Sequence, residues 1–116
     1  MEEIQVKYVD NIAVLTPNIN LSFDKTTVLK HYIEDVIQTG HVNLLIDLSN
    51  VTFICSSCLG ALIKYYDDLK LKKGKLKVCN VHNKILRVFR ILAFGELFQE
   101  EELIKNTDQA ISSFFE

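Results

Sequence analysis

Residues 44–62, LLIDLSNVTFICSSCLGAL, constrain the fold more than any other part of the chain, because an apolar strand runs there through two serines directly into a helix. The almost continuous apolar run over residues 43–48 is typical of a central strand that is covered on both faces. The apolar spacing after the serines predicts a helix that ends at Gly74. Its buried stripe is predicted to comprise Leu59, Leu62, Ile63, Tyr66 and Leu69.

Other segments have the composition of strands. Residues 4–9 and 12–16 are short and rich in β-formers, and Asp10-Asn11 between them is a turn signal, so they are predicted to form a hairpin. Residues 76–81 are predicted to form a further strand, and residues 97–98 a short edge strand.

Hydrophobic periodicity predicts three more helices: one between Ser22 or Asp24 and Gly40, one around residues 85–92 and one near the C-terminus. The first is expected to bury Leu29, Tyr32, Ile33, Val36 and Ile37. Ser22 or Asp24 is expected to cap its start, and Gly40 to follow its end. The helix around residues 85–92 is expected to end near Gly95, and Thr107 or Asp108 to cap the start of the last helix. Together the elements predict an α/β protein with a mixed sheet, in which an initial hairpin is followed by parallel strands, and about four helices.

Length and charge narrow the classes of function. The 116 residues fit one domain, 1–116, and the net charge of −2 with scattered basic residues gives no electrostatic footprint for nucleic acid. No apolar run approaches the roughly 18–20 residues that span a bilayer, and the acidic start lacks the regions of a signal peptide. We therefore expect a cytoplasmic protein without membrane insertion, as a monomer or weak homodimer.

Ser56 and Ser57 are expected beside the first turn of a helix, where free backbone N–H groups and the positive end of the dipole favour an anion. A serine just before a helix is usually an N-cap, which accounts for one serine but not for two at the C-terminal end of a central strand. Phosphorylation there would add about −1.5 to −2 charges, which the helix start tolerates and a docked partner does not. Capping and regulation both remain open at this point.

The stretch resembles the signature of the STAS domain, the module of anti-sigma factor antagonists, in which a strand of the kind IDLS-x-V-x-FID precedes SSGLG-x-L. Residues 81–98, VHNKILRVFRILAFGELF, are similar to the family's third helix and following loop, and residues 107–111, TDQAI, to the start of its last helix. The resemblance covers nearly the whole chain. It implies a STAS-like fold without metal or organic cofactor, and a partner-switching role in bacterial transcription regulation. The partner would be an anti-sigma factor, usually a serine kinase, whose phosphorylation of the domain reverses binding.

The resemblance also implies site residues. Ser56 matches the serine that is usually phosphorylated, and Ser57 is the second choice. The partner-binding surface is expected around Asn20, Ser56, Ser57, Cys58, Leu59 and Gly60. Gly60, which has no side chain, would let a partner approach the helix closely.

Three positions depart from the family pattern. Cys55 stands in place of an aspartate, Cys58 in place of a glycine, and Asn20 where the family tends to have an aspartate, with Asp24 near enough to substitute. Cysteine is a weaker hydrogen-bonding group than aspartate. An alternative is therefore a STAS-like scaffold, or a subunit of a transport or signalling complex, that is not phosphorylated.

The cysteines suggest two other kinds of site. Cys55, Cys58, Cys79 and His82 have the spacing of a Cys₃His zinc site, and Cys55 with Cys58 alone would make a redox pair. Against zinc, we expect the Cys55 side chain to point into the core.

The sequence contains no arrangement of residues that is typical of an enzyme active site. The histidines have no carboxylate at a spacing that suggests a triad, so we expect no enzyme and no catalytic residues. Asp47 superficially resembles the phosphoacceptor of response-regulator receivers, but the other acidic and Lys-Pro elements of a receiver do not accompany it.

Overall fold

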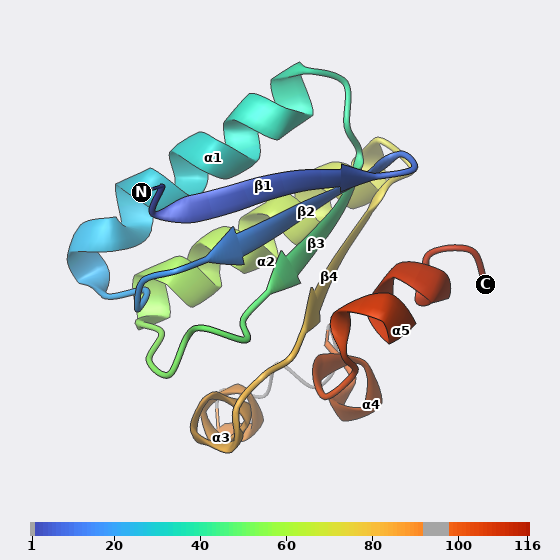
Figure 1. Ribbon diagram of the computed structural model, residues 1–116. Helices are drawn as coiled ribbons and strands as arrows, with labels where there is room; N and C mark the ends of the chain where they lie inside the picture. Colours follow the sequence, from blue (N-terminus) through green and yellow to red (C-terminus); the bar gives the residue numbers. More distant parts are fainter. Residues whose placement is uncertain (1, 92–97) are drawn as a thin grey trace.

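A four-stranded sheet with helices on both faces organises the computed structural model, which describes residues 2–91 and 98–116 (Figure 1). Its strands are β1 (Ile4–Val9), β2 (Ile12–Pro17), β3 (Asn43–Asp47) and β4 (Lys75–Cys79). The order is β1-β2-β3-β4; β1 pairs antiparallel with β2, and the other two pairings are parallel. The predicted mixed sheet, a hairpin followed by parallel strands, is confirmed.

The helices lie between and after the parallel strands. In chain order they are the 3₁₀ turn η1 (Phe23–Lys25) and α1 (Thr26–Gln38), α2 (Ser56–Leu71), α3 (Asn83–Ile91), α4 (Glu100–Leu103) and α5 (Thr107–Ser113). The described residues thus contain one α-helix more than the four expected, because the four-residue α4 is too short to have an apolar period. Of the predicted edge strand, Phe98 lies in a bend, whereas Leu97 lies outside the described residues, as does the predicted stop Gly95. None of the described helices is long and apolar enough to cross a membrane.

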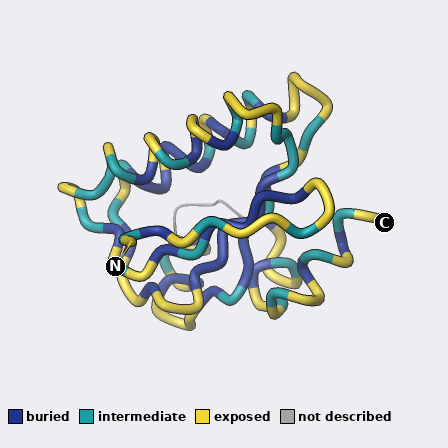
Figure 2. The backbone as a smooth tube through the Cα atoms, turned by 45° about the horizontal axis from the view of Figure 1, so that its top comes forward, coloured by how far each residue is buried: buried dark blue, intermediate teal, exposed yellow. Residues whose placement is uncertain are grey.

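Two apolar clusters lie on opposite faces of the sheet. Helices α1 and α2 cover the face that carries Leu15 and Ile46, whereas α5 covers the face that carries Val14 and Leu45. Figure 2 shows the buried backbone concentrated along the strands between these helices. The prediction of a strand covered on both faces is therefore confirmed, although the strand ends at Asp47 and not at Leu48 as predicted.

The buried stripe of α2 differs in part from the predicted one. Leu59, Leu62 and Leu69 are buried as expected, but Ile63 and Tyr66 are half-exposed, and Tyr65 is buried instead. The Tyr65 hydroxyl donates a hydrogen bond to Glu34 Oε2 over 2.6 Å, so its polar end is satisfied. Burial, followed by the hydrogen bond to Glu34, raises the pKa of Tyr65. On α1, Leu29, Ile33 and Val36 are buried, while Tyr32 and Ile37 pack at the edge of the same cluster.

A buried carboxylate ties the C-terminal part of the chain to the sheet. Asp47, at the end of β3, accepts hydrogen bonds from the Ser49 N–H, the Asn80 side-chain amide and the Thr107 hydroxyl, at 3.0, 3.0 and 2.9 Å. Thr107 therefore does not cap α5 as predicted, and neither does Asp108. The cap is Asn106, whose side chain accepts the Gln109 N–H at 2.8 Å in a capping box.

Gly74 follows the end of α2 but does not supply its left-handed residue. Lys73 has the positive φ of 63°, and the Gly74 N–H donates to the Leu69 carbonyl oxygen at 2.7 Å, as in a Schellman motif. Gly74 is needed for a different reason, because a Cβ atom there would lie 2.0 Å from the Val42 carbonyl oxygen. The close approach of these two backbones lets β4 begin beside β3.

Candidate partner-binding site

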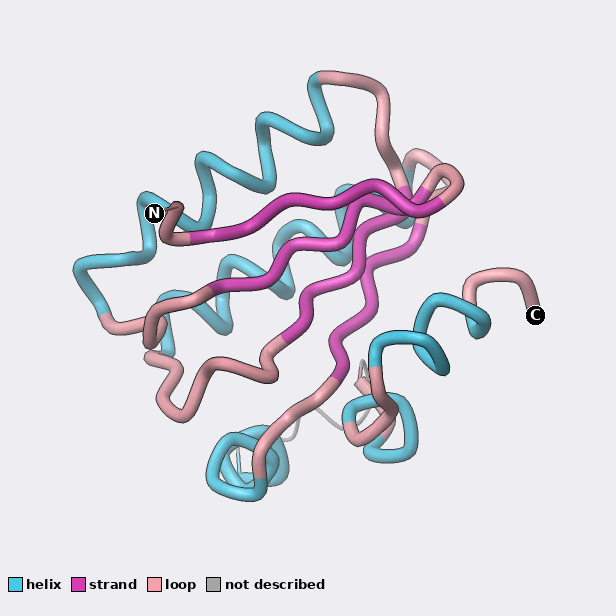
Figure 3. The backbone as a smooth tube through the Cα atoms, viewed as in Figure 1, coloured by secondary structure: helices cyan, strands magenta, loops and turns pink. Residues whose placement is uncertain are grey.

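Two loops meet at the end of the sheet where β2 and β3 terminate, and they run side by side in Figure 3. Leu21 and Ile54 form a parallel β-bridge between these loops. The Leu21 N–H donates to the Phe53 carbonyl oxygen at 3.0 Å, and the Cys55 N–H donates to the Leu21 carbonyl oxygen at 2.8 Å. This pairing brings the starts of α1 and α2 together.

Asn20 fixes the loop that leads into α2. Its Oδ1 atom accepts hydrogen bonds from the backbone N–H groups of Thr52 and Phe53, at 2.9 and 3.2 Å. Asp24, the suggested substitute, instead accepts the Ser22 hydroxyl at 2.7 Å, a hydrogen bond that lowers the pKa of Asp24. Asn20 is thus exposed near the predicted site, and its acceptor atom holds the loop in place.

The two serines have different surroundings. Ser56 is the first residue of α2 and is exposed, whereas Ser57 is half-buried. The Ser57 hydroxyl lies 2.7 Å from Thr26 Oγ1 and 3.1 Å from Cys55 Sγ. A modifying enzyme can therefore reach Ser56 more directly than Ser57.

Cys55, and neither serine, is the N-cap of α2. Its backbone is extended, and its sulfur accepts the Cys58 N–H at 3.4 Å. The Cys55 side chain, which was expected to point into the core, is half-buried: it packs against the edge of the core cluster, and its thiol also lies over the first turn of the helix. Partial burial opposes ionisation of the Cys55 thiol and by itself would raise its pKa. Hydrogen bonds outweigh this effect and lower the pKa of Cys55 to about 7; they come from the Ser57 hydroxyl, the Cys58 backbone N–H, and the side chains of Cys58 and Thr26.

The predicted contact residues divide into exposed and buried groups. Cys58 and Leu59 are 0% and 2% exposed, so their side chains do not form an outer surface as expected. Burial raises the pKa of Cys58 to about 11, and its thiol donates weakly to the Ser22 carbonyl oxygen at 3.8 Å. Gly60 is exposed, and a Cβ atom added there would meet nothing within 4 Å. Of the six predicted residues, the exposed ones are Asn20, Ser56 and Gly60.

The four residues of the suggested zinc site do not converge. Cys58 packs in the cluster beneath α1 and α2, whereas Cys79 packs on the opposite face of the sheet beside Ala110 of α5. His82 Nε2 lies 2.8 Å from the Ser49 carbonyl oxygen. Within residues 2–91 and 98–116, no group of three or more His, Cys, Asp or Glu side chains is arranged to hold a metal ion.

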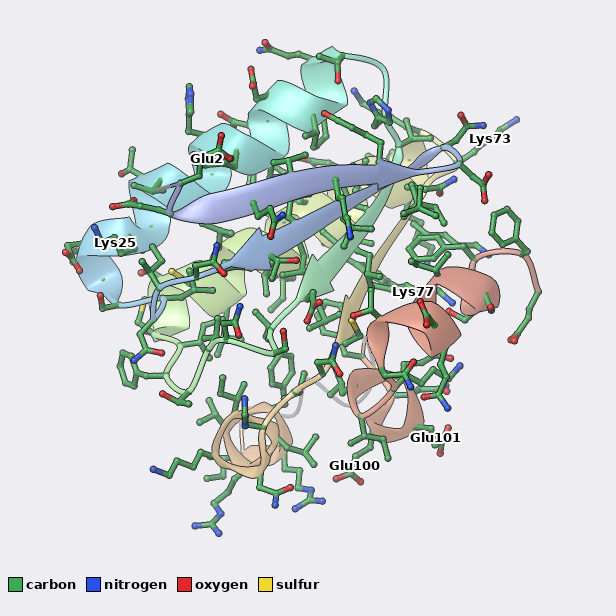
Figure 4. All side chains as sticks on the ribbon, viewed as in Figure 1. Glu2, Lys25, Lys73, Lys77, Glu100 and Glu101 are labelled. Atoms are coloured by element: carbon green, nitrogen blue, oxygen red, sulfur yellow. The ribbon has the colours of Figure 1, made fainter. Side chains whose placement is uncertain are left out.

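Sequence reasoning missed two exposed aromatic side chains beside the serines. Phe23, in η1, is 79% exposed, and Phe53, two residues before the cap of α2, is 53% exposed. Phe53 belongs to the signature stretch, and Phe23 stands among polar residues. Neither position shows from the sequence alone that the aromatic side chain is exposed. Lys73, beside Gly74, is remote from this site, since it lies at the opposite end of the molecule from Lys25 of η1 in Figure 4.

Comparisons with known proteins agree with this architecture. The family model for the STAS domain matches residues 3–110. An anti-sigma factor antagonist from Mycobacterium paratuberculosis is similar at 22% identity over 97% of this chain and 93% of its own, with a TM-score of 0.85.

Solved structures of two further proteins are similar at low identity. Bacillus SpoIIAA is 17% identical over 95% of this chain. The structure of its unphosphorylated form is covered to 94% with a TM-score of 0.80. The structure of its phosphorylated form is covered to 97% with a TM-score of 0.72. A sulfate transporter family protein from Wolinella succinogenes is 18% identical over 92% of this chain and 87% of its own, with a TM-score of 0.77. The comparison with curated proteins gives no match.

Proposed function

Because this chain belongs to the STAS domain family, we propose that it is an anti-sigma factor antagonist, which acts in the bacterial cytoplasm by binding an anti-sigma factor and performs no catalysis itself. The observation that carries this proposal is the exposed serine at the start of α2, flanked by two exposed phenylalanines. The likeness to solved anti-sigma factor antagonists supports it through the shared fold.

The proposed contact surface consists of Phe23, Phe53, Ser56 and Gly60. Ser56 and Gly60 are four residues apart on α2 and therefore share one face of the helix. Phe53 lies two residues before the cap of that helix, and η1, which carries Phe23, packs against α2. Large exposed apolar side chains that gather around polar groups are typical of protein interfaces, in which buried aromatic anchors contribute most of the binding energy.

We further propose that the partner is a serine kinase and that Ser56 is its phosphorylation site. A phosphate at the first position of α2 would face the backbone N–H groups of that turn, so the free protein tolerates the charge. In a complex the same charge would be buried against Phe23 and Phe53 of this chain without a counter-charge from them, which opposes binding. Phosphorylation would therefore release the partner and leave the antagonist folded.

The phosphorylation step is tested by incubating the purified protein with Mg-ATP and each anti-sigma factor of the source organism, followed by mass spectrometry. We expect one added phosphate, located on Ser56 and absent from Ser56→Ala. A phosphate on Ser57 alone would place the switch on the second serine. If the true partner binds and adds no phosphate, the proposed switch is refuted, and the chain is then an antagonist that is not regulated by phosphorylation.

Gly60→Ala is expected to stabilise the fold and weaken partner binding at once. A glycine inside a helix costs about 0.5–1 kcal/mol relative to alanine, and the space around Gly60 is open, so the free energy of unfolding should rise by that amount. If the partner packs closely on the helix, the added methyl group should weaken binding about tenfold. Urea unfolding and titration calorimetry measure the two effects. A more stable variant with unchanged affinity would show that the partner does not cover Gly60.

Phe53→Ala is expected to weaken binding at least tenfold, because an exposed aromatic residue at the centre of an interface contributes more than about 1 kcal/mol. Its unfolding free energy should change by less than about 0.5 kcal/mol, as for other surface substitutions. Phe115→Ala is the matched control, since Phe115 is 67% exposed near the C-terminus, away from the start of α2. Equal affinities of the two variants would contradict the proposed contact surface.

A further inference from the structure

The first turn of α2 gathers two thiols and two hydroxyls. Thr26 Oγ1 lies 3.9 Å from Cys55 Sγ and 3.4 Å from Cys58 Sγ, and the Ser57 hydroxyl lies 3.1 Å from Cys55 Sγ. Both sulfurs therefore adjoin one hydroxyl group on α1. We propose that Cys55 and Cys58 form a reversible disulfide, in which Cys55 is the attacking thiol and Cys58 the resolving thiol.

The backbone places the two cysteines within reach of each other. Cys55 is the N-cap and Cys58 the third residue of the helix, and residues three apart on a helical turn have Cβ atoms about 5–6 Å apart. A disulfide needs a Cβ separation of about 3.5–4.5 Å, so a small adjustment at the cap is required. The Cys55 sulfur already lies over the turn, 3.4 Å from the Cys58 nitrogen. Forming the bond thus requires no rearrangement of the sheet or of α2 as a whole.

The two thiols differ in accessibility and in ionisation, and the difference assigns their roles. Cys55 is half-buried, and hydrogen bonds lower its pKa to about 7, so a large fraction is thiolate near neutral pH. Cys58 is fully buried, and burial raises its pKa to about 11, so it stays a protonated thiol shielded from solvent. An oxidant therefore meets Cys55 first, and the neighbouring Cys58 can react only with what Cys55 has become.

Hydrogen peroxide or an organic hydroperoxide is the oxidant class that fits this arrangement. The Cys55 thiolate attacks one peroxide oxygen, the O–O bond breaks, and the products are a sulfenic acid on Cys55 and a hydroxide or alkoxide that takes up a proton. The Cys58 sulfur then attacks the Cys55 sulfur, its proton passes to the departing hydroxyl group, and water leaves. In total, two thiols are oxidised to one disulfide while the peroxide is reduced to water, or to water and an alcohol. A small dithiol restores the reduced pair by exchange.

Oxidation would also change the surroundings of the serines. Drawing the Cys55 sulfur toward Cys58 removes it from its contact with the Ser57 hydroxyl, one residue from Ser56. An effect on the partner would rest on the proposed function, but the formation of the disulfide does not. A protein that forms the bond and binds no anti-sigma factor would refute the proposed function alone.

Peptide mapping of the full chain tests the disulfide. The reduced protein is treated with a small excess of hydrogen peroxide at pH 7, denatured, alkylated and digested with trypsin, which leaves Cys55 and Cys58 together on residues 31–64 and Cys79 on residues 78–84. We expect the 31–64 peptide to be two hydrogens lighter and unalkylated, and to take up two alkyl groups after treatment with dithiothreitol. The Cys79 peptide should be alkylated in every sample after denaturation. In the folded protein Cys79 is fully buried on the other face of the sheet, so peroxide does not reach its thiol.

Variants assign the roles. Cys58→Ser should accumulate a sulfenic acid on Cys55 that dimedone captures, and Cys55→Ser should lose at least tenfold in the rate of peroxide consumption, whereas Cys79→Ala should form the disulfide as the wild type does. Circular dichroism checks that each variant is folded. The proposal is overturned if folded wild-type protein stays reduced, if Cys55 proceeds to sulfinic acid without an internal bond, or if the only disulfide joins two chains.

Discussion

Replacing Ser56 with aspartate is expected to weaken binding of the anti-sigma factor at least about 30-fold, while the free energy of unfolding changes by less than about 1 kcal/mol. The negative charge would stand at the first position of α2, where the helix dipole favours it by about 0.3–1 kcal/mol. In the complex, the same charge would be buried beside Phe23 and Phe53, which are exposed in the free protein and would be covered by the partner. An unpaired charge at an interface costs about 2–5 kcal/mol, which corresponds to 30-fold to several thousand-fold in affinity.

Titration calorimetry with the purified partner measures this effect, and two controls isolate its cause. Ser56→Ala should bind within about threefold of the wild type, because it removes the hydroxyl without adding a charge. Ser112→Asp places the same charge on an exposed position of α5, away from the proposed contact surface, and should also bind normally. If Ser56→Asp binds as tightly as these two controls, Ser56 does not lie in the interface.

Gly74→Ala is expected to cause the largest loss of stability, at least about 3 kcal/mol. The added Cβ atom would lie 2.0 Å from the Val42 carbonyl oxygen and 2.7 Å from the Val42 Cβ atom, far inside van der Waals contact. The obstructing oxygen belongs to the backbone and also accepts the Lys75 N–H at 3.0 Å, so it cannot move away without disrupting the start of β4. Overpacking usually costs about 1–3 kcal/mol, and a clash with backbone lies at or above the upper end.

Equilibrium unfolding in urea measures this loss, and Gly60→Ala is the matched control for it. Both variants add one methyl group to a glycine, but the space around Gly60 is open, so that variant should gain stability. Effects of opposite sign are therefore expected from the same chemical change. A Gly74→Ala variant as stable as the wild type would mean that the two backbones are not in close approach at this point.

The sheet could be predicted because its signals are local. The apolar run of β3 and the hydrophobic periods of α1 and α2 lie within single elements, and their alternation along the chain specifies a mostly parallel sheet. The stripe of α2 was less well determined, since Tyr65 and Tyr66 both follow Leu62 at helical spacing. The choice of Tyr65 depends on Glu34, a partner on another helix that no local pattern identifies.

The site was harder to predict for the same reason. The position of Ser56 at a helix start follows from the chain itself, but the engagement of Ser57 depends on Thr26, which lies 31 residues away in the chain. The capping role of Cys55 was missed because cysteine is not among the residues that usually cap helices. Thr107 has the composition of a cap and nevertheless donates to Asp47, 60 residues away. Long-range hydrogen bonds thus determine the roles of Tyr65, Ser57 and Thr107, which no local pattern in the sequence identifies.

Binding of an anti-sigma factor is tested most directly by titrating the unmodified, reduced protein with each purified anti-sigma factor of the source organism in a calorimeter, without nucleotide hydrolysis. Our account predicts that one of them forms a one-to-one complex with a Kd below about 10 μM, equivalent to more than about 7 kcal/mol of binding free energy. It also predicts that Phe53→Ala weakens this complex, whereas Phe115→Ala does not. If no anti-sigma factor binds the folded protein, or if the complex is indifferent to the residues around the start of α2, the account is contradicted.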